Sequence, residues 1–235
     1  NHTSWGSYFY DQSEDALRVT VPAVAGDFIE RLRYQFTDHS ENSAKIELAW
    51  ERRRAAFKVE VDLHGIVLEN IRNELRNIPG FTWEGWNAAA NYALANNVNL
   101  EEGLAWANRS ISGGFGAQPT FENLSTKSKL LAKLNQPAEA RNAMDKALQL
   151  ANAQQMYSHG KDLLNAGKTA EALKVFETNR IQNPNDNFIT SLGLAEAYKA
   201  MGDKRQAIRY YEMTAQYAPA NRAQAYRDEA AKLKR

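Results

Sequence analysis

The residues that come closest to a reactive arrangement lie in the stretch "KVEVDLH", residues 58–64. Four polar side chains alternate there with apolar ones and would share one face of a strand, namely Lys58, Glu60, Asp62 and His64. Two carboxylates and an imidazole on one face could bind a metal ion or transfer protons. The same alternation is typical of an ordinary strand with one solvated face. We expect the solvated face, because the remaining histidines show no spacing typical of metal ligands.

Other motifs give no better starting point for chemistry. The chain has no cysteine, which excludes disulfides, thiolate catalysis and Cys-ligated zinc. The glycines of "GGFG" at 113–116 lack the Lys-Ser/Thr pair that follows in a phosphate-binding loop. The run "ERRR" at 51–54 is typical of a solvated turn rather than of a nucleic-acid contact. The sequence therefore predicts no cofactor, no metal site and no catalytic residue, and we expect a protein that is not an enzyme.

Bulk composition sets limits on partners. Of 235 residues, 29 are basic and 28 acidic, so the net charge of +1 creates no general attraction to nucleic acid. No segment approaches the roughly 18 consecutive apolar residues of a membrane helix. We expect neither nucleic-acid binding nor membrane insertion.

The first part of the chain has the period of β-strands. Apolar residues recur at every second position in five segments separated by turn-rich breaks, and these segments are 4–10, 16–24, 28–36, 44–50 and 56–63. Such strands bury one face and need a second layer. We therefore predict an antiparallel β-domain over residues 1–65, incomplete by itself, that forms the C-terminal part of a larger β-sandwich and begins inside that domain.

After about residue 66 the apolar period changes to that of helices. We expect linking helices over residues 66–120, packed between the two parts, and helical repeats over residues 121–235. The repeats are visible when residues 156–184 are set above residues 191–219. Matching positions are all 35 residues apart and include Gly160 with Ala195, Gly167 with Gly202, Phe176 with Tyr211 and Pro184 with Pro219.

These matched residues resemble the tetratricopeptide repeat, a helix–turn–helix unit. Small residues let paired helices approach, glycine supplies a positive φ at the turn, and the aromatic residue fills the space between neighbours. Weaker copies cover residues 124–152 and 83–111, and the helix at 221–235 is polar enough to cap the array. The predicted fold class is α+β, an incomplete antiparallel β-domain followed by an all-α tetratricopeptide-like helical solenoid.

The β-rich part also resembles a family. The segments "WGSYFYDQSEDALRVTV" and "FKVEVDLHGIVLENIRNEL" resemble bacterial proteins of the domain of unknown function 2911 family, over residues 3–112. The resemblance implies further strands upstream and export to the periplasm or cell envelope. It implies no established activity.

The predicted site is the concave groove of the repeats. In tetratricopeptide arrays this surface is lined by the first helix of each repeat, which here gives Ser125, Lys129, Lys133, Tyr157, Lys161, Asn165, Leu192, Glu196 and Lys199. The lysines make the groove mildly basic, which suits an acidic or extended peptide. We expect a non-enzymatic interaction scaffold with a protein or peptide partner, and the oligomeric state stays open.

Three other functions remain possible. An enzyme is one of them, which a loss of activity on replacing Glu60 or His64 by alanine would support. The array could be a structural spacer packed on the β-domain. The β-domain could instead be a carbohydrate-binding module that uses Trp5, Tyr8 and Tyr10, because aromatic rings bind sugars as well as peptides.

Overall fold

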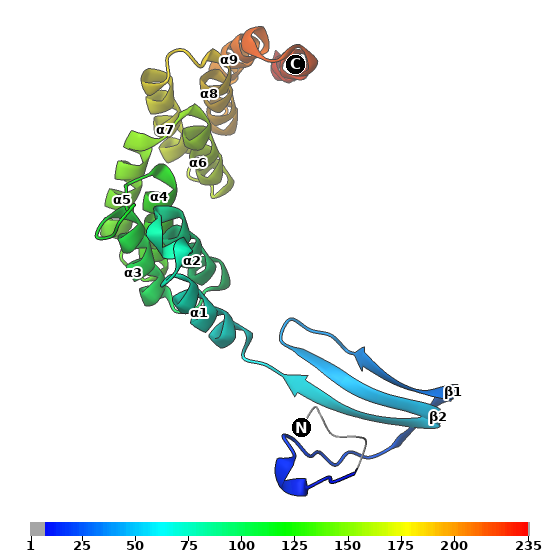
Figure 1. Cartoon of the computed structure of the whole chain (residues 1–235). Helices are drawn as coiled ribbons and strands as arrows, with labels where there is room; N and C mark the ends of the chain where they lie inside the picture. Colours follow the sequence, from blue (N-terminus) through cyan, green and yellow to red (C-terminus); the bar gives the residue numbers. More distant parts are fainter. Residues whose placement is uncertain (1–7, 235) are drawn as a thin grey trace. The chain divides into compact units, whose positions relative to one another are not determined.

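The computed structural model describes residues 8–234 and divides the chain into two compact units, the first ending at Arg72 and the second beginning at Asn73. The first unit holds the β-strands, and the second holds a series of packed helices (Figure 1). The predicted α+β class, with a helical solenoid-like region after an antiparallel sheet, is confirmed.

The sheet is an antiparallel hairpin of two long strands, β1 (Val24–Thr37) and β2 (Ser43–Glu60). The break predicted between the segments 28–36 and 44–50 is confirmed as the loop between these strands, where Asp38 adopts a positive φ of 49°. The Asp38 carboxylate also accepts a hydrogen bond of 2.5 Å from the Lys45 ammonium group.

The prediction of five strands is wrong for the described residues, which contain two. The predicted strands at 44–50 and 56–63 belong to one strand, β2, and the run at 51–54 lies inside it rather than at a turn. No glycine or proline interrupts that run. Glu51 has a φ of 46°, and the register shifts on both sides of Ile29, so the extra residues are taken up by β-bulges.

The predicted strand at 16–24 also fails, because residues 17–23 join no ladder before β1 begins. Residues 8 and 9 lie in a turn instead of a strand, and a short 3₁₀ helix, η1 (Gln12–Glu14), follows. The rest of the predicted first strand lies outside the described residues.

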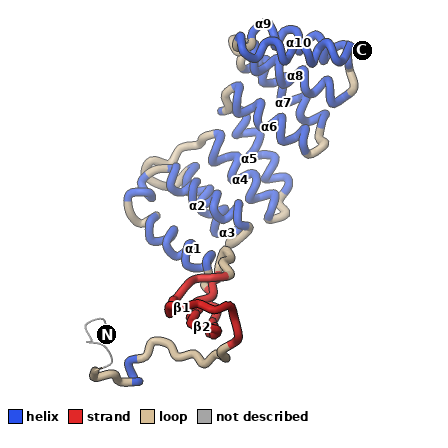
Figure 2. The backbone as a smooth tube through the Cα atoms, turned by 90° about the vertical axis from the view of Figure 1, so that its right-hand side faces the viewer, coloured by secondary structure: helices blue, strands red, loops and turns tan. Residues whose placement is uncertain are grey.

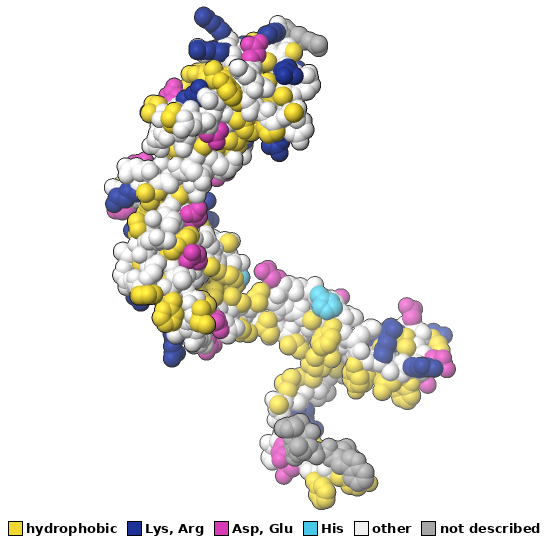
Figure 3. All heavy atoms as spheres, turned by 45° about the horizontal axis from the view of Figure 1, so that its top comes forward, with side chains coloured by type: hydrophobic (Ala, Val, Ile, Leu, Met, Phe, Trp, Pro, Cys, Tyr) yellow, Lys and Arg dark blue, Asp and Glu magenta, His cyan; other side chains and the backbone are white. Residues whose placement is uncertain are grey.

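A β-sandwich is therefore not what the described residues form. The hairpin leaves large apolar side chains at its surface, including Val24, Phe28, Leu32, Tyr34, Phe36 and Trp50 (Figure 3). Tyr34 pairs with Leu48 and Phe36 with Ile46, so these four residues share one face. The described residues contain no further strand that could form the second layer which the sequence predicts over that face.

The "KVEVDLH" stretch spans a change of structure rather than one strand. The strand β2 ends at Glu60, and the helix α1 (Leu63–Glu74) already contains His64. The Asp62 carboxylate accepts a hydrogen bond of 3.0 Å from the amide of Gly65, so it satisfies a free N–H of the first turn. The four polar groups of the stretch therefore do not share a strand face.

The second unit begins with a 3₁₀ helix, η2 (Ile78–Phe81), and continues through helices that pack mainly with their neighbours in sequence (Figure 2). These helices are α2 (Trp83–Asn96), α3 (Leu100–Ile111), α4 (Phe121–Lys133), α5 (Pro137–Leu150), α6 (Ala153–Asn165), α7 (Thr169–Gln182), α8 (Asn187–Met201), α9 (Lys204–Tyr217) and α10 (Ala220–Lys234). They form the hairpins α2–α3, α4–α5, α6–α7 and α8–α9, and α10 packs on α9. The segments paired in the sequence thus become helical hairpins.

Each hairpin turns through a residue in the left-handed region. The φ values are 54° at Asn97, 58° at Asn135, 75° at Gly167 and 80° at Gly202. Glycine adopts this conformation without strain, and asparagine is the residue that tolerates it next best. The turn chemistry explains why the earlier hairpins, which use asparagine, give the weaker sequence signal.

Phe176 is the centre of the core in the later hairpins. It is fully buried in α7, between Gly160 of α6 and Gly193 of α8. A Cβ atom added at either glycine would come within 2.3 Å of the Phe176 ring. The aromatic ring therefore occupies space that only glycine leaves free, and it joins one hairpin to the next.

The packing is interrupted at one place in the array. The helices α7 and α6 both pack on α8, and α3 and α2 both pack on α4, but neither α4 nor α5 has more than marginal backbone contact with α6 or α7. A cleft of about 470 Å³ lies there, lined by Met144 and Leu148 of α5 and by His159 and Leu163 of α6. The connector before α6 is only residues 151–152, whereas residues 183–186 precede α8.

Candidate functional site

The helices α6 and α8 are the first helices of adjacent hairpins, and they bring three of the predicted groove residues into direct contact. The Tyr157 hydroxyl donates a hydrogen bond of 3.1 Å to Oε2 of Glu196. The Lys161 ammonium group lies 3.0 Å from the same oxygen. Tyr157 and Lys161 are one turn apart on α6, so both side chains reach the same point on α8.

Tyr157 is anchored in the core while its hydroxyl faces Glu196. Its ring packs against Phe176, with 6.0 Å between the ring centroids. Burial, followed by the charge of Glu196, raises the pKa of the Tyr157 phenol. The phenol therefore stays protonated and acts as a hydrogen-bond donor.

A second ion pair continues this surface onto α10. Lys199 lies one turn beyond Glu196 on α8 and approaches Glu229 of α10, with 2.6 Å between Nζ and Oε2. Lys232 binds the other oxygen of Glu229 at 2.7 Å. Hydrogen bonds from Lys199 and then Lys232 lower the pKa of the Glu229 carboxyl to about 2. The Lys199 ammonium also lies 5.9 Å from the centroid of the Tyr211 ring.

We call this surface the Glu196 face, defined by Tyr157, Lys161, Glu196, Lys199 and Glu229. Four of its members were predicted as groove residues from the sequence, and Glu229 was not. The sequence does contain a sign of the position of Glu229: the next residue, Ala230, follows Ala195 by the repeat length of 35 residues. In the structure these two alanines are buried in the same cluster. The capping helix therefore continues the register of the repeats and places Glu229 beside α8.

Two predicted groove residues do not line a surface. Ser125 is 8% exposed, because α2 and α3 pack against its helix α4. Leu192 is 7% exposed and packs with Ala195, Tyr211 and Ala230, so α10 covers it. The prediction is wrong for both, because the packing of the neighbouring helices covers positions that would otherwise be open.

The remaining predicted groove residues are exposed; Asn165 lies one turn after Lys161 of the Glu196 face, whereas the other two belong to a different helix. Lys129 and Lys133 belong to α4 and Asn165 ends α6. Lys129 is within electrostatic reach of His159, whose pKa is lowered by burial. Since α4 and α5 do not pack on α6, the structure divides the predicted groove into two parts.

The aromatic residues of the first unit do not form the expected strand platform. Trp5 lies outside the described residues. Tyr8 and Tyr10 are exposed at the surface, and the Tyr10 hydroxyl donates to Asp15 at 2.9 Å. Carbohydrate binding through these rings stays a prediction that this arrangement neither tests nor favours.

Residues 8–234 offer neither a metal site nor a membrane-spanning helix. That part of the chain contains no cluster of three or more His, Asp or Glu side chains able to hold a metal ion. None of its helices has the length and apolar character needed to cross a bilayer.

Comparison with known proteins finds a similarity in the first part of the chain. A search of curated proteins finds no match. A family model described as "Protein of unknown function (DUF2911)" matches residues 1–59. Over these residues the predicted resemblance to that family is confirmed, and the chain's β-rich part is similar to proteins whose function is not known.

Proposed function

We propose that this chain is a non-enzymatic protein-interaction scaffold whose helical unit is a tetratricopeptide-type array and binds a peptide segment of a partner protein. The observation that carries the proposal is the Glu196 face. There the first helices of two hairpins, α6 and α8, and the capping helix α10 present aromatic and charged side chains side by side.

The tetratricopeptide assignment is supported by three features that act together. The repeat length is 35 residues in the last two hairpins, the turns take the left-handed conformation, and Phe176 fills the space between Gly160 and Gly193. Arrays of such hairpins expose a row of side chains from the first helix of each unit. The row in this chain includes Tyr157, Lys161, Glu196 and Lys199.

The ion pairs of the face are compatible with binding an acidic peptide. Lys161 and Lys199 are each paired with a glutamate, and their side chains are 38% and 46% exposed. Pairs of this kind contribute only about 0–1 kcal/mol. A carboxylate of a ligand can therefore replace or share Glu196 or Glu229 at small cost, while the existing pairs hold the lysines in position before binding.

Tyr157 can anchor a ligand at little cost in side-chain entropy, because its side chain is already held in one position. Its ring is fixed by Phe176, and its hydroxyl is held as a donor beside Lys161. Aromatic residues in partly desolvated positions are the side chains that contribute most to binding at protein interfaces. We expect the ligand to place an acidic group near Lys161 and Lys199 and an apolar or aromatic group near Tyr157.

The experiment selects peptides from a displayed library of random sequences on the full chain and measures their affinity by calorimetry. Replacing both lysines, in the variant Lys161→Gln/Lys199→Gln, is expected to weaken binding of acidic peptides about tenfold or more, because two charge-assisted hydrogen bonds are lost. The matched control is Lys168→Gln/Lys204→Gln, which removes the same charge from exposed lysines near the starts of α7 and α9.

The outcome has two clear forms. Selected peptides that bind the control but not the test variant support the Glu196 face as a binding site. Selection that enriches no peptide, or affinity that is equal in all three proteins, contradicts the proposal and favours the spacer role.

A further inference from the structure

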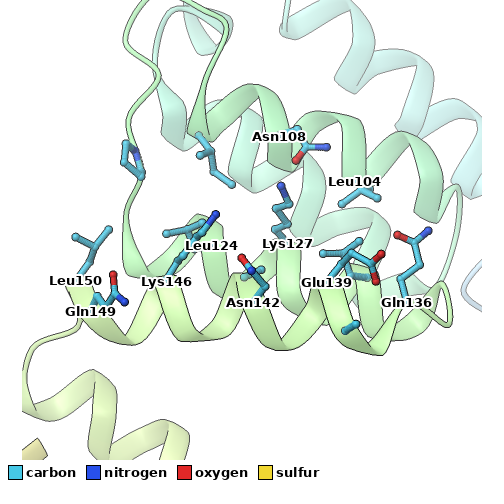
Figure 4. A pocket seen from close by; sticks show the side chains of 15 residues that line it. Leu104, Asn108, Leu124, Lys127, Gln136, Glu139, Asn142, Lys146, Gln149 and Leu150 are labelled. Atoms are coloured by element: carbon cyan, nitrogen blue, oxygen red, sulfur yellow. The ribbon is translucent and has the colours of Figure 1, made fainter. Parts of the chain in front are cut away.

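A larger groove lies in the earlier part of the helical unit, away from the Glu196 face. It has a volume of about 930 Å³ and is formed by α3, α4 and α5 (Figure 4). Sites that hold compact ligands measure roughly 300–1,000 Å³. Its apolar lining comes from all three helices and includes Leu104, Ile111, Leu124, Leu131, Ala143 and Leu150.

Two lysines enter this groove without a carboxylate to neutralise them. Lys127 comes from α4 and Lys146 from α5. Among the described residues, neither ammonium group has an acidic partner within ion-pair distance. Burial, followed by repulsion from Lys146, lowers the pKa of Lys127. The groove thus holds two like charges that destabilise each other in the free protein.

The acidic residue that lines the groove does not neutralise these lysines. Glu139 is seven positions before Lys146 on α5, which is about 10 Å along the helix. Figure 4 places Glu139 beside Gln136 and Leu104, and it places Lys127 between Asn108 and Asn142. The charge in the middle of the groove is therefore positive.

Amide side chains complete the walls. Asn108 comes from α3, and Gln136, Asn142 and Gln149 come from α5 or the residue before it. Each amide can both donate and accept hydrogen bonds. An extended peptide has unpaired N–H and C=O groups that need such partners, whereas a bound helix satisfies its own backbone. The walls therefore match an extended main chain better than a helix.

We propose that the α3–α5 groove binds an extended peptide segment in which an acidic residue is flanked by apolar residues. The carboxylate lies between Lys127 and Lys146, the apolar side chains lie on the leucine-lined floor, and the amides bind the peptide backbone. This site goes beyond the Glu196 face, since it uses other helices and other side chains. It gives the array a second, separate binding surface.

The test uses the full chain and peptides enriched on it from the same displayed random library. The variant Lys127→Gln/Lys146→Gln is expected to lower the affinity of one class of enriched acidic peptides about tenfold or more. The variant Lys127→Arg/Lys146→Arg keeps both charges and is expected to retain binding. Circular dichroism and thermal melting check that both variants are folded as the wild type is.

A two-way comparison separates this proposal from the previous one. Peptides of the groove class should bind Lys161→Gln/Lys199→Gln with unchanged affinity, and peptides of the Glu196 class should bind Lys127→Gln/Lys146→Gln unchanged. If no enriched peptide loses affinity in Lys127→Gln/Lys146→Gln while others lose affinity in Lys161→Gln/Lys199→Gln, the further inference is overturned and the proposed function stands. If affinity falls only in Lys127→Gln/Lys146→Gln, the proposed function is overturned and the further inference stands.

The amides distinguish a peptide from another carboxylate ligand. Asn108→Ala/Asn142→Ala is expected to weaken the peptides and to leave decanoate, a carboxylate with an apolar chain and no peptide groups, unaffected. If decanoate binds as tightly as the peptides and the amide variant changes neither, the groove is a site for a carboxylate amphiphile and the peptide proposal is wrong.

Discussion

At the scale of single residues, the helical unit depends on pairs of side chains whose sizes are matched. Phe176 is completely buried, and it fits because Gly160 and Gly193 have no Cβ atoms on either side of its ring. Helical glycine is ordinarily unfavourable by about 1 kcal/mol relative to alanine. Packing against the Phe176 ring, and not helix propensity, therefore explains glycine at these two positions.

This packing predicts the effect of one methyl group. Gly160→Ala should lower the free energy of unfolding by about 1–3 kcal/mol, because overpacking of a full core outweighs the gain in helix propensity. Ser158→Ala, at an exposed position of the same helix, should change it by less than about 0.5 kcal/mol. Urea denaturation of both variants measures the difference, and an unchanged or raised stability of Gly160→Ala would show that Phe176 is not confined as described.

Glu229 makes a second prediction, on pH dependence. Its pKa in the folded chain is lowered to about 2 from an ordinary value of 4.5, because Lys199 and Lys232 donate to its carboxylate. A lowered pKa means that the ionised form stabilises the folded state above about pH 4.5, and that this stabilisation is lost as the pH falls towards about 2.

The measurement compares wild type with Glu229→Gln by urea denaturation at the two ends of that range. The stability difference between the two proteins should shrink as the pH falls. A difference that stays constant through the range would mean that Glu229 does not keep α10 in place through its charge.

At the scale of elements, the helices were easier to predict than the strands. The helical hairpins follow from apolar periodicity and from turn residues that take the left-handed conformation, such as Gly167 and Gly202. Both signals are local, so a single sequence contains them. The strands were misjudged where a charged run, 51–54, looked like a turn but is a bulged part of β2. Bulges depend on the partner strand, which local patterns do not reveal.

The site was predictable to the extent that it depends on the repeat register. Tyr157, Lys161, Glu196 and Lys199 came from the alignment of repeats and do lie together. Glu229 was not predicted from the alignment of the repeats, because its position beside α8 depends on how α10 packs. The α3–α5 groove was missed as well, since Lys127 and Lys146 are distant in sequence and meet only through the pairing of α4 with α5.

The interruption between α5 and α6 predicts that the array unfolds in two parts. Helices α2–α5 and α6–α10 share little packing, so they should behave as separate cooperative units in native-state hydrogen exchange. Phe176→Ala should destabilise α6–α10 by about 3–5 kcal/mol and leave exchange in α2–α5 unchanged. Equal loss of protection in both parts would show that the array is one cooperative unit.

At the scale of the whole molecule, the two units differ in how completely they bury their apolar residues. Every helix of the helical unit from α2 to α10 contains buried residues, while Phe28, Tyr34, Phe36 and Trp50 of the hairpin are exposed. A hairpin of two strands is marginally stable without a further layer. The unit that matches the family model therefore brings an uncovered apolar face, and the helical unit brings the two candidate peptide sites.

The most direct test of the central claim is calorimetric titration of a library-selected acidic peptide into wild type and into Lys161→Gln/Lys199→Gln. Wild type should bind the peptide, and the variant should bind it at least about tenfold more weakly, with Lys168→Gln/Lys204→Gln equal to wild type. Equal affinity in all three proteins would contradict the claim that the Glu196 face is where this chain binds its partner.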